Sequence, residues 1–78
     1  MIKTVFVDIT KGDYNIVKEY PYNIQCSVGE YVDFDNFNPY ADDNFYKIIN
    51  IIHLPNEAKK FVEIKFFHSK KINRKEGF

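Results

Sequence analysis

The chain has 78 residues, with 11 basic and 11 acidic side chains, so its formal net charge at pH 7 is zero. This length provides for one domain, and zero net charge excludes a global field that would steer the protein toward nucleic acid or a membrane surface. A single cysteine, Cys26, excludes an internal disulfide framework, while eight Phe and six Tyr favour strands.

The first 20 residues predict a β-hairpin. Residues 2–10 alternate as a strand with Val5, Val7 and Ile9 on one face, and residues 14–20 form the second strand. The other face of the first strand carries Thr4, Phe6 and Asp8. Gly12 lies in the polar stretch between the two strands and supplies the positive φ that a tight turn needs. Pro21 ends the second strand, because proline cannot donate to a sheet.

The next 24 residues are less regular. Residues 22–28 are expected to be irregular or weakly extended, and Gly29 precedes a short strand over residues 30–34, with Val32 and Phe34 facing inward. Residues 35–44 are polar and contain a proline without apolar periodicity, so they predict a loop.

Residues 45–54 (FYKIINIIHL) are the longest apolar run and predict the central strand. A strict two-residue period places Ile48 and Ile52 on one face and Ile49 and Ile51 on the other. Both faces are therefore expected to be buried, as inside a barrel or beneath a second layer.

Residues 56–60 allow at most one helical turn after the central strand. Residues 61–67 (FVEIKFF) then predict a last strand, with Val62, Ile64 and Phe66 facing inward and the charged side chains facing outward.

These elements predict an all-β, or β-dominated α+β, domain of about five short antiparallel strands in a partly open barrel. We expect the domain to span residues 1–69 and residues 70–78 to form a basic, flexible tail.

Residues 28–32 (VGEYV) and 46–53 (YKIINIIH) resemble the turn-and-strand pattern of small SH3-like β-barrel proteins of bacterial or phage origin. The resemblance covers roughly residues 28–66. It implies an SH3-like barrel with a binding role, and it transfers no catalytic residue.

An acidic segment studded with aromatic residues, 31–45, is the leading candidate site. Such a segment can dock a basic protein surface, because the carboxylates steer the encounter and the rings give buried anchors. The candidate protein-binding residues are Tyr31, Asp33, Asp35, Phe37, Tyr40, Asp42 and Asp43. Asp33 and Asp35 resemble the start of a calcium-binding loop, but the later positions lack the required glycine and glutamate, so no metal is expected.

The basic C-terminal third supports an alternative function. Residues 58–78 hold seven basic and two acidic side chains, interleaved with aromatic rings. Lysines that track phosphates, combined with rings that stack on bases, are typical of single-strand binders built on small β-barrels. The candidate nucleic-acid-binding residues are Lys59, Lys60, Lys65, Phe67, Lys70, Lys71 and Arg74. A second alternative is a self-assembling structural protein in which the acidic segment of one copy meets the basic tail of the next.

Catalysis is not expected. Cys26, His53 and His68 are not linked by any motif spacing, and the glycines are too far apart for a phosphate-binding loop. We therefore expect a non-catalytic protein–protein interaction module without cofactor or metal. The chain lacks a signal-type N-terminus and an 18-residue apolar run, so we expect an intracellular, cytoplasmic protein.

Overall fold

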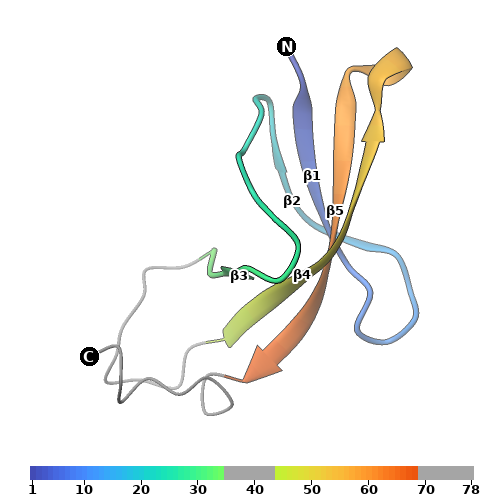
Figure 1. The fold of residues 1–78 in the computed structure, drawn as a ribbon. Helices are drawn as coiled ribbons and strands as arrows, with labels where there is room; N and C mark the ends of the chain where they lie inside the picture. Colours follow the sequence, from blue (N-terminus) through green and yellow to red (C-terminus); the bar gives the residue numbers. More distant parts are fainter. Residues whose placement is uncertain (35–43, 69–78) are drawn as a thin grey trace.

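The computed structural model describes residues 1–34 and 44–68, which form one curled sheet (Figure 1). In chain order the elements are β1 (Lys3–Asp8), β2 (Asn15–Tyr20), β3 (Tyr31–Val32), β4 (Asn44–Leu54), the 3-10 helix η1 (Pro55–Glu57) and β5 (Lys59–His68). The predicted small, strand-dominated, barrel-like fold is confirmed, as half a barrel of five strands. The predicted tail, 70–78, lies outside the described residues.

The sheet is mixed, whereas a wholly antiparallel sheet was expected. Its strand order is β2-β1-β5-β4-β3, and β1 pairs with β5 in parallel while every other neighbouring pair is antiparallel. The last strand of the chain therefore enters the centre of the sheet beside the first. Apolar alternation defines the faces of a strand but carries no information about the direction of its neighbour, so the sequence could not specify this pairing.

The predicted N-terminal hairpin is confirmed. β1 and β2 pair from Thr4 opposite Tyr20 to Asp8 opposite Asn15. Gly12 has φ 84°, and its N–H donates to the Ile9 carbonyl at 3.1 Å. The turn therefore uses the backbone conformation that only glycine adopts without strain.

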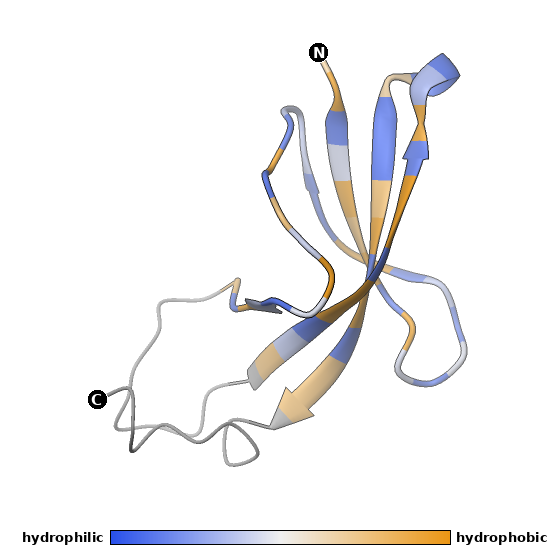
Figure 2. Ribbon diagram, viewed as in Figure 1, coloured by the Kyte–Doolittle hydropathy of each residue, from blue (hydrophilic) through white to orange (hydrophobic). Residues whose placement is uncertain are grey.

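One face of the sheet carries the main core. Phe6 from β1, Ile48 from β4, and Val62 and Ile64 from β5 form a cluster in which every side chain is at most 2% exposed. The side chains packed against this cluster come largely from the segment after β2: they are Tyr20, Ile24, Cys26, Val32, Phe34, Tyr46 and Ile51. Figure 2 shows apolar residues concentrated along the middle strands and in the segment that crosses them.

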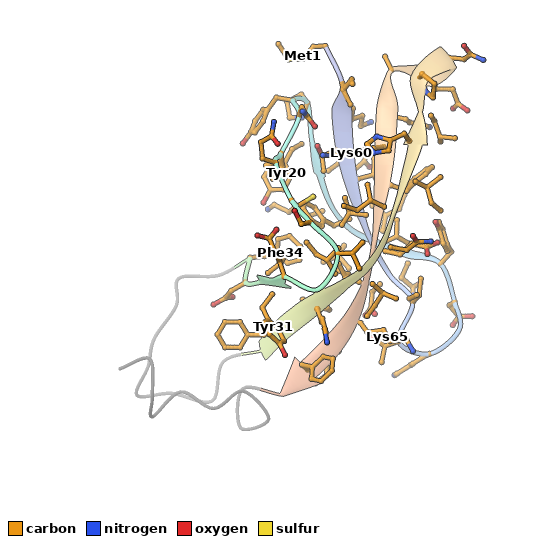
Figure 3. The ribbon with its side chains drawn as sticks, viewed as in Figure 1. Met1, Tyr20, Tyr31, Phe34, Lys60 and Lys65 are labelled. Carbon is orange, nitrogen blue, oxygen red and sulfur yellow. The ribbon has the colours of Figure 1, made fainter. Side chains whose placement is uncertain are left out.

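Two buried polar side chains hold the segment after β2 against this face. The Thr4 hydroxyl donates to the Tyr22 carbonyl at 2.9 Å and accepts from the Ile24 N–H at 2.9 Å. The Lys60 ammonium donates to the Ile24 carbonyl at 2.6 Å (Figure 3). Buried polar groups need such partners, so these bonds fix where the covering segment crosses the sheet.

The prediction that β4 is buried on both faces is wrong. Ile48 is 1% exposed but Ile49 is 36% exposed, and the pairing with β5 shifts between Ile48 and Asn50. A bulge adds one residue to one strand, so the alternation of faces restarts one position later. Ile51 consequently packs against the same cluster as Ile48, although strict alternation had placed it on the opposite face.

Two further expectations, the length of the third strand and the burial of Phe66, need correction. The third strand covers only Tyr31–Val32 of the predicted 30–34. Val62 and Ile64 are buried as predicted, but Phe66 is 40% exposed. Phe66 lies beyond the core cluster, and its ring makes a T-shaped contact with Tyr46 at 5.9 Å.

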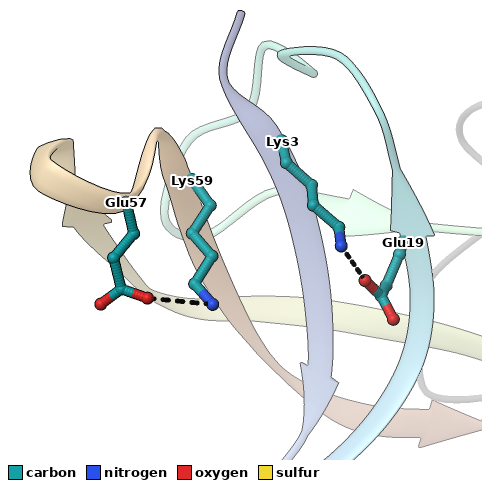
Figure 4. Close-up of polar contacts among 4 residues, drawn as sticks. All are labelled: Lys3, Glu19, Glu57 and Lys59. Carbon is teal, nitrogen blue, oxygen red and sulfur yellow. Dashed lines mark ion pairs between the residues drawn. The ribbon is translucent and has the colours of Figure 1, made fainter.

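The predicted helical turn between the last two long strands is confirmed as η1. Ala58 ends it in the left-handed conformation, with φ 52°. The ion pair between Glu57 and Lys59 (3.2 Å) lies beside this turn, and a second pair joins Lys3 to Glu19 (2.6 Å; Figure 4). Such exposed pairs each contribute about 0–1 kcal/mol.

Candidate functional site

Three side chains form a row across β3, β4 and β5 on the face opposite the core. Tyr31 pairs with Lys47, and Lys47 pairs with Lys65. Their neighbours Ile48 and Ile64 belong to the core, so Lys47 and Lys65 project from the other face. Figure 3 shows Tyr31 and Lys65 toward the same end of the sheet.

Phe67 completes this group from the next outward position on β5. The rings of Tyr31 and Phe67 meet edge to face, with centroids 6.0 Å apart and planes at 88°. The Lys47 ammonium lies 5.9 Å from the Tyr31 centroid and 6.0 Å from that of Phe67. We call Tyr31, Lys47, Lys65 and Phe67 the aromatic–lysine site.

The electrostatics of the aromatic–lysine site are unbalanced. Lys47 on β4 lies directly opposite Lys65 on the neighbouring strand β5. Neither lysine forms an ion pair with any residue in 1–34 or 44–68. Like charges in this arrangement destabilise a sheet. The site therefore presents two adjacent positive charges that an anionic ligand would neutralise.

The site is also accessible. Tyr31 is 47% exposed and Lys65 is exposed, while Lys47 and Phe67 are half-buried. The exposed Tyr31 ring offers a surface on which a planar group can stack.

The turn before β3 positions Tyr31 beside Lys47. Gly29 has φ 96°, its N–H donates to the Ile48 carbonyl at 2.8 Å, and the Ile48 N–H donates to the Glu30 carbonyl at 2.8 Å. The Glu30 carboxylate in turn accepts from the Ser27 N–H at 2.6 Å. This turn fixes the register of β3 on β4 although the strand itself has only two residues.

Only Tyr31 and Asp33 of the predicted protein-binding residues are described. Tyr31 belongs to the aromatic–lysine site, and Asp33 is half-buried. Asp35, Phe37, Tyr40, Asp42 and Asp43 lie outside the described residues.

The predicted nucleic-acid-binding residues divide into two groups along β5. Lys65 and Phe67 lie in the aromatic–lysine site. Lys59, which pairs with Glu57 and lies 5.3 Å from the Phe61 ring centroid, is at the other end of the strand. Lys60 is 5% exposed and its ammonium donates to the Ile24 carbonyl, so it supports the fold. Lys70, Lys71 and Arg74 lie outside the described residues.

Sequence reasoning missed Lys47. It stands between two apolar residues of β4, and no charge run or motif marks it. The outward direction of Lys47 could be inferred from alternation with Ile48. Its position between Tyr31 and Phe67 depends on strand pairing, which the sequence pattern did not provide.

The remaining reactive side chains are dispersed. Cys26 is half-buried against the core, and His53 is exposed on β4. Tyr14 donates to the Glu63 carboxylate at 2.7 Å, and partial burial, this hydrogen bond and the nearby charge raise the pKa of Tyr14 to about 12. Within the described residues, no three His, Cys, Asp or Glu side chains gather where they could hold a metal ion.

No family model matches the chain, and no curated protein and no solved structure matches it either. Residues 1–34 and 44–68 include no helix that is long and apolar enough to cross a lipid bilayer. Inference about function therefore depends on the geometry of the aromatic–lysine site.

Proposed function

We propose that this chain is a non-catalytic binding domain that holds a single-stranded nucleic acid on the aromatic–lysine site. The observation that carries the proposal is the direct opposition of Lys47 and Lys65, neither of which has an ion-pair partner among the described residues, beside the rings of Tyr31 and Phe67. Phosphate groups would neutralise the two lysines, and bases would stack on the exposed ring.

The ring geometry favours a single strand over a duplex. A base–aromatic stack contributes about 1–3 kcal/mol and requires a base whose flat face is accessible. The ring planes of Tyr31 and Phe67 are perpendicular. A base stacked flat on the Tyr31 ring would therefore contact the Phe67 ring edge to face. One stacked base with phosphates on either side fits the four side chains.

The sequence that follows β5 is also basic. β5 ends at His68, and Lys70 and Lys71 follow within three residues of it. An SH3-like barrel that acts inside the cell, as the sequence pattern suggests, is consistent with this proposal.

An acidic protein segment is the alternative ligand that the same lysines would attract. The protein-binding hypothesis uses the acidic residues of 31–45 instead, and most of them lie outside the described residues. A test must therefore compare a nucleic acid with an acidic polypeptide on the same variants.

Fluorescence anisotropy with a labelled single-stranded oligonucleotide tests the proposal. We expect binding at low salt that weakens as salt increases, with a slope of about 0.7 per phosphate contact in a plot of log affinity against log salt concentration. The double variant Lys47→Gln/Lys65→Gln should lose about two such contacts and bind at least ~10-fold more weakly at low salt. Tyr31→Leu should weaken binding by about 5–150-fold through loss of stacking.

The matched control is Lys3→Gln/Lys59→Gln, which removes the same charge from two lysines that pair with Glu19 and Glu57. This variant should bind with nearly wild-type affinity. Equal weakening by both double variants, or tighter binding of poly-glutamate than of the oligonucleotide, would refute the proposal.

A further inference from the structure

Half of the outer edge of β4 has no neighbouring strand among the described residues. On this side β3 pairs only with Tyr46 and Lys47, and the Ile48 backbone bonds to the turn before β3. On its other side β4 pairs with β5 as far as Leu54. Among the described residues, the stretch 50–54 is therefore paired with β5 on one side and open on the other (Figure 1).

The direction of the backbone groups on this edge follows from β5. The Ile64 carbonyl accepts a hydrogen bond from the chain just beyond β1, at 2.9 Å. With a two-residue period, Val62 and Lys60 also direct their backbone groups toward β1. Their partners on β4, Ile51 and His53, cannot bond to them and direct N–H and C=O groups to the open edge. There the Ile51 N–H donates to the side-chain oxygen of its neighbour Asn50 at 3.1 Å, an exposed local bond that a pairing strand would replace.

The side chains of this edge lack the features that prevent strand pairing. Residues 49–54 read Ile-Asn-Ile-Ile-His-Leu and contain no lysine, arginine, acid or proline. The opposite edge of the sheet, β2, carries Lys18 and Glu19 and a register shift against β1. Charged side chains are a usual protection of sheet edges, and β2 carries them whereas residues 51–54 do not; the bulge of β4 lies between Ile48 and Asn50, before this stretch.

We propose that the open half of β4 pairs with the same residues of a second copy of this chain. The two copies would run antiparallel about a two-fold axis at Ile52, with Ile51 of each copy opposite His53 of the other. Each such pair exchanges both of its N–H···O bonds, and Ile52 meets Ile52 of the second copy on the face opposite the core.

The occupant is a second copy because the stretch is complementary to itself. At this register no charged side chain of one copy lies opposite a charged side chain of the other. Self-pairing of β2 would instead bring Lys18 and Glu19 of both copies together. The core of the domain is also small: only seven apolar side chains of the described residues are buried. Chains of this size commonly add disulfides, metals or oligomerisation to such a core.

Sedimentation velocity over about 10 µM to 1 mM protein tests this pairing, because dimers form by mass action. The wild-type mass should rise from that of one chain toward twice that value. His53→Pro removes an outward N–H and no bond to β5, so it should fold and keep the mass of one chain throughout.

The matched control is Glu19→Pro on β2. Glu19 lies opposite Val5, which directs its backbone toward β5, so this proline also removes an outward N–H. Glu19→Pro should dimerise as the wild type does. A wild-type mass of one chain at every concentration, or dimerisation of His53→Pro equal to that of wild type, would overturn the proposal.

Hydrogen exchange on the wild type provides a measurement that does not depend on the folding of a variant. The amides of Ile51 and His53 should exchange more slowly as protein concentration rises, and added salt should not reverse this, because the interface carries no charge. Exchange of these amides that is independent of concentration contradicts the pairing. Salt-sensitive association would instead indicate contact between acidic and basic segments.

Discussion

At the scale of single residues, burial and pairing assign different roles to side chains that the sequence grouped by charge. Lys59 and Lys60 are adjacent and were both considered ligand-binding residues. Because successive strand residues face opposite sides, Lys60 enters the core face and bonds to Ile24, while Lys59 remains on the other face beside Glu57. Position in a charge run therefore does not define availability for a ligand.

Tyr14 gives a prediction at this scale. Its pKa is raised to about 12 by partial burial, by the hydrogen bond to Glu63 and by the charge of that carboxylate. Folding therefore favours the protonated phenol. This contribution to stability is complete below the ordinary tyrosine pKa of about 10 and is lost as pH rises through about 12.

Ultraviolet titration of phenolate absorbance measures this effect. The wild type should show one tyrosine that ionises about two pH units later than an ordinary tyrosine, and Tyr14→Phe should lack this late component. Tyr31→Phe is the control and should retain it. A late component that persists in Tyr14→Phe would show that another tyrosine is responsible.

At the scale of secondary structure, the bulge in β4 decides which isoleucines form the core. Ile48 and Ile49 are adjacent β-branched residues that strict alternation assigns to two buried faces. The bulge leaves Ile49 36% exposed and brings Ile51 to the side of Ile48. A one-residue insertion in the ladder thus reverses the facing of every later residue of the strand.

Alanine substitution distinguishes the buried Ile48 from the exposed Ile49. Ile48→Ala should lower the free energy of unfolding by about 2–5 kcal/mol, because it opens a cavity in the core cluster. Ile49→Ala should lower it by less than about 1 kcal/mol, because the side chain is already largely in water. Chemical denaturation of both variants measures this difference, and equal losses would contradict the bulge.

Several elements could be predicted from the sequence because their signals are local. Gly12 between two alternating runs indicated the first hairpin, and residues 56–60 between two strand patterns allowed the short helical turn. The parallel pairing of β1 with β5 and the bulge at Ile49 could not be predicted, because both depend on contacts between residues far apart in the chain.

At the scale of the whole molecule, the fold does not keep the acidic and basic halves of the sequence apart. β5, from the basic third, occupies the centre of the sheet, and its far end brings Phe67 against Tyr31 from the acidic segment. The candidate site therefore combines Tyr31 from the predicted protein-binding residues, and Lys65 and Phe67 from the predicted nucleic-acid-binding residues, with Lys47, which belonged to neither set. Only strand pairing, and no feature of composition, creates this combination.

An ¹⁵N–¹H NMR titration with a short single-stranded oligonucleotide at low salt would map the bound ligand on the protein. We expect the largest shifts at Tyr31, Lys47, Lys65 and Phe67, whereas the amides of β2 and η1 should hardly move. Shifts concentrated on β2 or η1, or no shifts at all, would contradict this expectation.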